Sequence, residues 1–411
     1  MQRKERLHIL ILRNNLRTKD NQALNAALNA AKRAKTQHLL AIFSTEILEG
    51  SFLSHETASV LRKEVTFGAV LDLRASLEKL NISLYITDSF EHTLQSLAKE
   101  FSLILYISQE VGTQERALEQ QLCRYEHRLF FEQTMIEPFV FDYTKSFSHF
   151  RNRVIATKIK APEPEPKPLQ NNTRAYDIAQ PNITKYENLE APFTQKSAAA
   201  RVVFYLKNHL YDYEKSRWFI DGEDISTHFS PYLSLGIISP KSLHKSLREA
   251  EANYGASSSS AFIFMELLWR DFFHHVMRQS HNQLFLSSGF GDVAVQASKN
   301  QEFLERFYTA QTDEPLINAG IKELRLSGWL SNRMRQLLAN YFCRVLGLDF
   351  RYGAAFFQTY LIDYNPAANW GNWAYQAGVG NDKRGNVFDI AAQSARYGGA
   401  AYIEKWRKKE L

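Results

Sequence analysis

The sequence has little of what a disulfide scaffold, a zinc site or a membrane anchor needs. Its 411 residues include only two cysteines, Cys123 and Cys343, which excludes a disulfide framework and a zinc site built from thiolates. The basic N-terminus is followed by a short apolar run at residues 7–12, too short for a signal peptide or a transmembrane helix. We therefore expect a soluble, cytoplasmic protein without a membrane partner.

A fingerprint for nicotinamide dinucleotides is missing as well. The first strand-like run is followed by RNNLRTKD and not by a GxGxxG motif, which argues against an NAD-binding site. Charge does not single out a partner, because 50 Lys and Arg against 44 Asp and Glu give a net charge of only +6. This mildly basic balance is compatible with a nucleic-acid partner but does not require one.

The first 157 residues alternate strand-like and helix-like segments. Short apolar runs are typical of buried parallel strands, and the stretches between them have helical spacing. This alternation predicts crossover units and a parallel sheet, as in a Rossmann-like α/β domain. The expected strands are Leu7–Leu12, Leu39–Phe43, Ile82–Ile86 and Leu103–Ile107, and the expected helices include Asn21–Lys35 and Thr57–Leu80.

The rest of the chain is predicted to form a linker, 158–195, and a helical domain, 196–411. The linker includes KIKAPEPEPKPLQ, in which alternating proline and charge favour an extended backbone. From Ser197 onward, apolar residues recur with helical periodicity and strand candidates are few. We therefore expect an α/β domain, 1–157, joined to an all-α domain.

The first candidate cluster for chemistry is DISTHFSPYLSLGIISP, at Asp224–Pro240. Ser226, Thr227 and Ser230 come just before Pro231, which suits the first turn of a helix. Hydroxyls and free backbone N–H groups at a helix start are suited to binding a phosphate. A plain helix cap is the commoner explanation of this pattern, and the residues alone leave both open.

The second cluster is FIFMELLWRDFFHHVMR, at Phe262–Arg278. Glu266 shares a helix face with Trp269 and Arg270, and a carboxyl in so apolar a run needs a partner. A buried helix with a satisfied ion pair would explain it without any function. The adjacent histidines, His274 and His275, point in different directions and are not a metal signature, so no metal is expected.

The third cluster consists of SGWLSNRMRQ and of LIDYNPAANWGNWAYQAGVGND. In the first segment, a helix is predicted to begin at Asn332, directly after a Trp-containing stretch. The second segment, Leu361–Asp382, interleaves amide side chains with Trp and Tyr. Amides beside aromatic rings suit a planar heterocycle with polar edges.

Together these segments resemble the photolyase/cryptochrome family over nearly the whole chain. RNNLRTKDNQAL, at Arg13–Leu24, resembles the start of that family's antenna domain. ELLWRDFF, GWLSNR and the segment ending NWGNWAYQAGVGND resemble its flavin domain. NWGNWAY with GVGND, and Gln336 after Arg335, is most similar to the DASH-type cryptochrome branch. The resemblance implies FAD bound in the helical domain of a monomer.

The resemblance also implies a role for individual residues. Glu266 would meet the base edges of the lesion, Asn369 would lie against the flavin N5, and Trp373 would transfer an electron to the flavin. Catalytic residues would be Glu266, Trp269, Asn332 and Tyr375; FAD contacts would be Tyr213, Ser226, Thr227, His228, Phe229, Ser230, Arg335, Asp363, Asn365 and Asn369; DNA contacts would be Arg217, Arg270, Asn332 and Arg333; and Glu110 would contact a folate (MTHF) antenna.

The implied activity is blue-light-driven splitting of cyclobutane pyrimidine dimers in DNA, with single-stranded DNA as the expected partner. The alternative is a blue-light signalling flavoprotein without repair activity. Glu266, Trp269 and Asn332 favour repair. A third hypothesis, a redox flavoenzyme that uses NADH, is weakened because the nicotinamide fingerprint is missing.

One departure from the family concerns flavin photoreduction. The family uses three tryptophans that lead to the surface, and Trp373 matches the one next to the flavin. The middle position is Phe350 and the outer one falls near Ala297. Because phenylalanine is hard to oxidise, we expect this chain of electron carriers to be broken.

Overall fold

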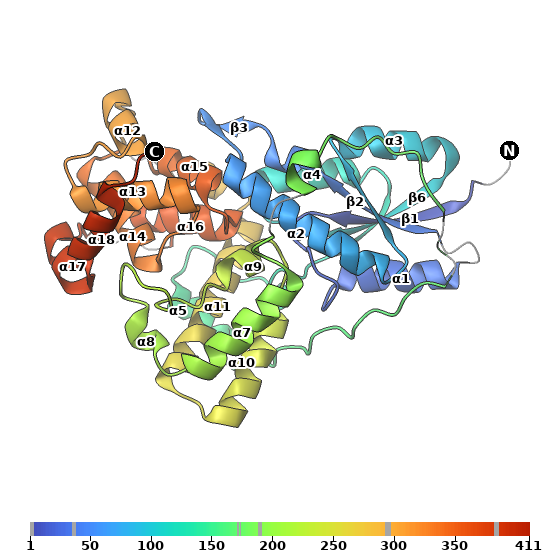
Figure 1. The fold of residues 1–411 in the computed structure, drawn as a ribbon, viewed down its shortest axis with the longest axis horizontal. Coiled ribbons are helices and arrows are strands. Elements are labelled where there is room, and N and C mark those ends of the chain that lie inside the picture. The colour runs from blue at the N-terminus through green and yellow to red at the C-terminus, as the bar shows by residue number, and fades with distance from the viewer. Residues whose placement is uncertain are drawn as a thin grey trace.

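The computed structural model describes residues 4–34, 38–170, 172, 174–187, 191–291, 297–381 and 386–411. Asp382, the last residue of the GVGND motif, lies outside these ranges. Figure 1 shows an α/β part around a central sheet, and beside it a cluster of helices from the second half of the chain. The predicted fold class, an α/β domain followed by a helical domain, is therefore confirmed.

The central sheet is parallel throughout, in the order β5-β2-β1-β6-β7. The four predicted strands are confirmed as β1, β2, β5 and β6, within a residue or two of the predicted ends. The edge strand β7 was not predicted, because its sequence EHRLF is exposed and polar and has no apolar run. The strands are β1 Arg6–Leu12, β2 Leu39–Ser44, β5 Ser83–Thr87, β6 Ser102–Ser108 and β7 Glu126–Phe130, with a small hairpin of β3 Ser51–Phe52 and β4 His55–Glu56.

Both faces of the sheet are covered by helices, so the central strands β2, β1 and β6 are largely apolar on both sides. Along β1, Leu10 and Leu12 join the core under the helices that follow β1 and precede β5. Ile9 and Ile11 face the opposite side and join the core under the next two helices. This is the reason that the strands read as continuous apolar runs. The helices of this part are α1 Gln22–Arg33, α2 Val60–Glu78, α3 Phe90–Glu100 and α4 Thr113–Leu122.

The second half of the chain is helical where it is described. The longest helix, Ser258–Ser280, contains the predicted helix Phe262–Arg278 and begins with a capping box between Ser257 and Ser260. The helices are α5 Phe147–Val154, α6 Thr184–Glu187, α7 Gln195–Asn208, α8 Tyr213–Ser216, α9 Ser230–Ser234, α10 Pro240–Tyr254, α11 Ser258–Ser280, α12 Gln301–Tyr308, α13 Pro315–Ser327, α14 Asn332–Asn340, α15 Phe350–Tyr360, α16 Pro366–Ala377, α17 Ile390–Tyr397 and α18 Gly399–Arg407. Short turns of helix are η1 Thr45–Leu48, η2 Gln283–Phe285 and the π-helical η3 Tyr341–Val345.

The segment between the sheet and the linker packs into the helical core. Phe147 and Phe150 of α5 belong to the same hydrophobic cluster as Phe272 of α11. The linker in turn runs back along the α/β part, where Tyr186 stacks on Phe67 of α2 with ring centres 3.9 Å apart. The two parts therefore share extensive contacts, and the exact domain bounds stay a prediction.

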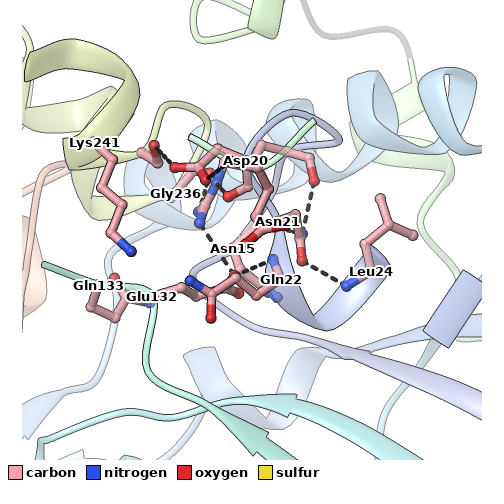
Figure 2. Close-up of polar contacts among 12 residues, drawn as sticks. Asn15, Asp20, Asn21, Gln22, Leu24, Glu132, Gln133, Gly236 and Lys241 are labelled. Atoms are coloured by element: carbon pink, nitrogen blue, oxygen red, sulfur yellow. Dashed lines mark hydrogen bonds and ion pairs between the residues drawn. The ribbon is translucent and has the colours of Figure 1, made fainter. Parts of the chain in front are cut away.

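A buried polar seam joins the two parts where RNNLRTKD follows β1 (Figure 2). The backbone N–H of Leu16 donates to the carbonyl of Leu235, at 3.1 Å. The guanidinium of Arg17 donates to the carbonyl of Gly236, at 3.1 Å, and lies 3.6 Å from the Glu132 carboxylate. This seam fixes the turn that follows α9.

We expect Gly236→Ala to destabilise the seam strongly. Gly236 has φ +71°, and a Cβ there would collide with the carbonyl oxygen of Asn14. Gly347→Ala is the matched control, because Gly347 also has positive φ, +61°, but nothing lies near its missing Cβ. Left-handed strain alone costs about 1–2 kcal/mol, and the collision should bring the loss at Gly236 to about 3 kcal/mol or more. Urea titration measures both losses, and equal losses would contradict the role of the close approach.

Candidate functional site

A cavity of about 410 Å³ lies among the helices of the second half. A smaller hollow of about 90 Å³ shares lining residues with it and reaches deeper, to Asn369 and Trp373. Both spaces combine apolar walls with polar groups, as small-molecule sites do. The cavity draws its lining from α8, α9, α11, α14 and α16 and from the loop before α9.

The loop before α9 is shaped by one arginine on α7. The Arg201 guanidinium donates to the carbonyls of Ser226, at 3.0 Å, and Thr227, at 2.9 Å, and pairs with Asp224 at 2.9 Å. These bonds hold backbone oxygens on the α7 side while the side chains of Ser226 and Thr227 line the cavity. Sequence analysis gave Arg201 no role, since nothing in the sequence links it to a loop more than twenty residues away.

The predicted helix start at Pro231 is confirmed, since α9 begins at Ser230 with proline in its first turn. Its N-cap is Phe229, which has no side-chain acceptor for the first N–H groups. Phe229 and Ser230 also line the cavity, so an uncapped helix start lies at its wall. His228 does not line the cavity, because its ring packs on Trp329 with ring centres 4.3 Å apart.

An ion pair closes one side of the cavity. The two terminal guanidinium nitrogens of Arg335 donate to the two carboxylate oxygens of Asp363, at 3.0 and 2.7 Å. The Asp363 side chain is only 1% exposed, while Arg335 is 26% exposed and lines the cavity. A bidentate pair of this kind fixes the direction of both side chains.

Asn365 connects the cavity to the buried histidine of α11. Its side-chain oxygen caps α16 by accepting from the Ala368 N–H at 3.1 Å. Burial, followed by the charge of Arg270, lowers the pKa of His274 well below its ordinary value, so the ring is neutral. Nδ1 of His274 therefore donates to the Arg270 carbonyl at 2.8 Å, and Nε2 accepts from Asn365 at 3.2 Å.

The deep end of the cavity presents an unpaired acceptor. Nδ2 of Asn369 donates to the Ala354 carbonyl at 2.9 Å, which fixes the direction of the amide. Its Oδ1 is buried and has no hydrogen-bond partner among the residues that the structure describes. An unpaired buried oxygen is costly, so this position calls for a donor from a bound group.

The mouth of the cavity carries the predicted lesion-facing residues. Glu266 accepts a hydrogen bond from Arg217, and both residues line the cavity. Burial raises the pKa of the Glu266 carboxyl, and the Arg217 charge partly opposes that rise. One face of Trp269 is stacked on Phe147, with ring centres 3.8 Å apart, and Tyr375 meets Trp269 edge-on at 6.2 Å. Because Phe147 covers one face of the Trp269 ring, that face is not free to stack on a bound base.

The predicted DNA contacts fall in three different surroundings. Asn332 is exposed at the cavity rim, while Arg333 is buried over the rings of Trp218 and Tyr397. Arg270 lines the cavity and donates to the Gln133 carbonyl. Burial lowers the pKa of Arg270 to about 10, so the group stays charged at neutral pH. Its second guanidinium nitrogen, Nη2, is buried without a partner, which favours an anion inside the cavity over DNA outside it.

Glu110, the residue expected to contact the antenna, lies in the loop between β6 and α4 and is buried. It accepts from Gln133 at 3.2 Å, and burial raises its pKa to about 8. It lines a separate hollow of about 590 Å³, together with Arg116 and Arg278. The predicted antenna contact stays a prediction.

Trp373, the predicted electron donor, is enclosed by phenylalanines. Its ring meets Phe342 and Phe357 edge-on, with ring centres 5.5 and 5.0 Å away. Phe350, at the position of the family's second tryptophan, is also buried in this core.

Several further residues line the cavity without having been assigned a role from the sequence. Gln376 and Trp329 lie at its walls. The sequence pattern around each of them does not distinguish it from an ordinary surface or core residue. The unassigned lining residues are Leu233, Ser234, Ile263, Leu267, Phe273, Trp329, Leu330, Gln336, Ala368, Asn372 and Gln376.

The lining fits a dinucleotide that carries a flat heterocycle. Hydroxyl-bearing residues, an uncapped helix start and Arg270 all line this one cavity, and such groups are suited to phosphates. Amide groups and the Asn369 oxygen suit the polar edges of a ring system. Within the described ranges, no three His, Cys, Asp or Glu side chains are grouped to hold a metal ion, and no helix is long and apolar enough to cross a membrane. The fold and the cavity define a class of protein in which a parallel α/β part is joined to a helical part that contains a site for such a dinucleotide.

Comparison with known proteins places the chain in a family. Residues 8–167 match the family model for DNA photolyase, and residues 262–409 match the FAD binding domain of DNA photolyase. A cryptochrome DASH of Idiomarina loihiensis is 31% identical over 98% of this chain and 92% of its own length. A chloroplastic or mitochondrial cryptochrome DASH of Arabidopsis thaliana is 32% identical over 95% of this chain and 73% of its own length.

Solved structures agree with this result. A cryptochrome from Synechocystis sp. PCC6803 matches with a TM-score of 0.89 at 27% identity, covering 99% of this chain and 89% of that chain. The chain belongs to the photolyase/cryptochrome family, and its curated relatives described above are DASH cryptochromes. Its helical half contains the family's FAD-binding domain.

The electrostatics at the cavity mouth lead to a prediction for Arg217→Met. Since the Arg217 charge lowers the pKa of Glu266, its removal should raise that pKa and keep the carboxyl protonated to higher pH. The infrared C=O band of the protonated carboxyl, assigned by its loss in Glu266→Gln, measures this during a pH titration. Lys215→Met, an exposed neighbour on α8, is the control and should leave the band unchanged.

Proposed function

We propose that this chain is a blue-light-dependent DNA photolyase that splits cyclobutane pyrimidine dimers in single-stranded DNA. The observation that carries the proposal is the Glu266 carboxyl, which lines the cavity mouth together with Trp269 and Tyr375 and whose side chain is 36% exposed there. A carboxyl kept in apolar surroundings next to aromatic rings suits a substrate that has flat bases and hydrogen-bonding edges. The cavity beneath it leads directly to the deep hollow at Asn369.

FAD would be held by the residues that line the two connected spaces. Ser226, Thr227 and Ser230 would bind the phosphates, together with Arg270, whose Nη2 lacks a partner. The Asn369 oxygen would accept a hydrogen bond from a ring N–H. When bound and reduced, FAD supplies a single electron on excitation by blue light.

Glu266 would supply a proton to the substrate. Its pKa is raised by burial, and Arg217 limits that rise while the site is free of DNA. A DNA phosphate that draws Arg217 away would leave the carboxyl neutral and able to donate to a base carbonyl. The donated hydrogen bond would stabilise negative charge on the lesion in a site that excludes water.

Repair by Glu266→Gln tests this role. The amide keeps the shape and one donor group but cannot lose a proton, so we expect repair per absorbed photon to fall about two- to ten-fold, the range of one hydrogen bond. The flavin is reduced chemically, and thymine-dimer oligonucleotides, single- and double-stranded, are illuminated with blue light. Glu249→Gln, an exposed carboxyl of α10, is the control.

The outcomes separate the candidate functions. Equal repair by Glu266→Gln contradicts the proposed role of the carboxyl, and loss of FAD in that variant makes Glu266 structural. Wild-type protein that holds reduced FAD but repairs neither substrate contradicts the enzyme and leaves the signalling flavoprotein as the alternative.

Flavin photoreduction through Trp373 would be inefficient. A radical cation on Trp373 would face Phe342 and Phe357, which are far harder to oxidise than tryptophan or tyrosine. We expect the flavin of oxidised wild-type protein to be photoreduced slowly in the presence of an external reductant. Flavin absorbance during illumination measures this rate. Phe350→Trp should accelerate reduction only if a further carrier leads to the surface. Rapid reduction that survives Trp373→Phe would overturn this prediction.

A folate antenna would occupy the hollow beside Glu110. Arg116 and Arg278 line this hollow and would attract the negatively charged glutamate of a folate. Phe131 and Phe141 provide apolar walls for a flat pterin ring.

A further inference from the structure

A ladder of arginines and aromatic rings extends from the cavity mouth to the surface. The Arg217 guanidinium lies 5.0 Å from the ring centre of Trp218. The Arg333 guanidinium lies over both Trp218, at 4.6 Å, and Tyr397, at 5.1 Å, and Arg396 lies over Tyr397 at 5.3 Å. The rings of Trp218 and Tyr397 are close to parallel, with an interplanar angle of 22°. We call these five residues the ladder.

The positive charges of the ladder's arginines are only partly neutralised by nearby carboxylates. Arg217 is paired with Glu266, and the nearby carboxylate of Asp221 is paired with Lys405 at 2.9 Å. Arg333 has no carboxylate partner within the described part of the chain, although its side chain is more than nine-tenths buried, and its Nε has no hydrogen-bond partner. Burial and the charges of Arg217 and Arg396 all lower its pKa. Such a cluster is suited to a chain of phosphates.

The ladder also offers a flat apolar surface. Trp218 is 39% exposed and its neighbour Phe219 is 45% exposed, although large aromatic side chains are usually better covered. The backbone N–H of Ile220 donates to the Tyr397 carbonyl at 3.2 Å, which holds this loop against α17. The exposed ring is therefore held in place and does not sit on a free loop.

We propose that Trp218 is a stacking platform for an unpaired nucleobase next to the lesion, with phosphates bound by the arginines of the ladder. This inference rests on the proposed action on DNA. It names the residue that distinguishes single-stranded from double-stranded DNA. Stacking on a ring needs an open base face, which an unpaired nucleotide has and a base inside a duplex lacks. Trp218 would thus favour single-stranded over double-stranded DNA, while the arginines would attract both.

Binding of undamaged DNA in the dark tests the proposal. Anisotropy titrations use a fluorescent 16-nucleotide oligo(dT) and a 16-base-pair duplex at one salt concentration. Trp218→Leu keeps apolar bulk but removes the flat ring, and should weaken single-strand binding roughly ten-fold. Duplex binding should change less than about two-fold. Trp218→Phe keeps a flat ring and should restore most of the single-strand affinity.

A matched control is Tyr254→Leu, which removes an exposed aromatic ring at the end of α10, outside the ladder. The Trp218 fluorescence, taken as the difference between wild type and Trp218→Phe, should be quenched by oligo(dT) and not by the duplex. Unchanged single-strand binding by Trp218→Leu, an equal loss for the duplex, or an equal loss in Tyr254→Leu would overturn the proposal.

These outcomes are distinct from those of the repair assay. A chain that shows Trp218-dependent strand selection but repairs no dimer contradicts the proposed enzyme and leaves the platform standing. A chain that repairs dimers but shows no Trp218-dependent strand selection contradicts the platform and leaves the proposed enzyme standing.

Discussion

The buried polar seam between the loop after β1 and the turn after α9 is the constraint on which the rest of the structure depends (Figure 2). Arg17 is almost completely buried, and its guanidinium donates to the carbonyls of Asp20 and Gly236 and lies 3.6 Å from the Glu132 carboxylate. Asp20 accepts from Ser239 at the start of α10. Since a buried charge that loses its partner is costly, the α/β part and the helical part hold each other in one relative position.

This seam adjoins the candidate cavity along the chain, because Gly236 follows two residues after Ser234, which lines the cavity. α9 leads directly into Leu235 and Gly236, so the hydroxyl-bearing loop before α9 is held from the far end by the α/β part and from the near end by Arg201. Other polar side chains of the cavity are also oriented by neighbouring groups. Asn365 is oriented by His274, and Asn369 is oriented by a backbone carbonyl. The polar groups of the cavity are thus aligned by neighbours before any ligand arrives.

Charge is arranged in a graded way from the interior to the surface. In the cavity, the cation of Arg270 and the hydroxyl-bearing residues Ser226, Thr227 and Ser230 belong to the same lining. At the mouth, Arg217 keeps the pKa of Glu266 from rising further. Beyond it, the buried Arg333 and the exposed Arg396 alternate with the rings of Trp218 and Tyr397. An anionic chain approaching this side would meet cations that are already oriented by stacking, which reduces the entropy cost of binding.

The sequence by itself determined the fold class, the positions of the buried strands, the helix starts at Pro231 and Asn332 and the family, because periodicity, proline and contiguous motifs are local signals. It did not indicate β7, whose exposed polar residues leave no apolar pattern. It also could not show that Phe147 covers one face of Trp269, or that Arg270 points into the cavity while Arg333 packs against Trp218 and Tyr397. Only the tertiary structure decided these points, because each depends on contacts between residues far apart in the chain that no spacing along the sequence encodes.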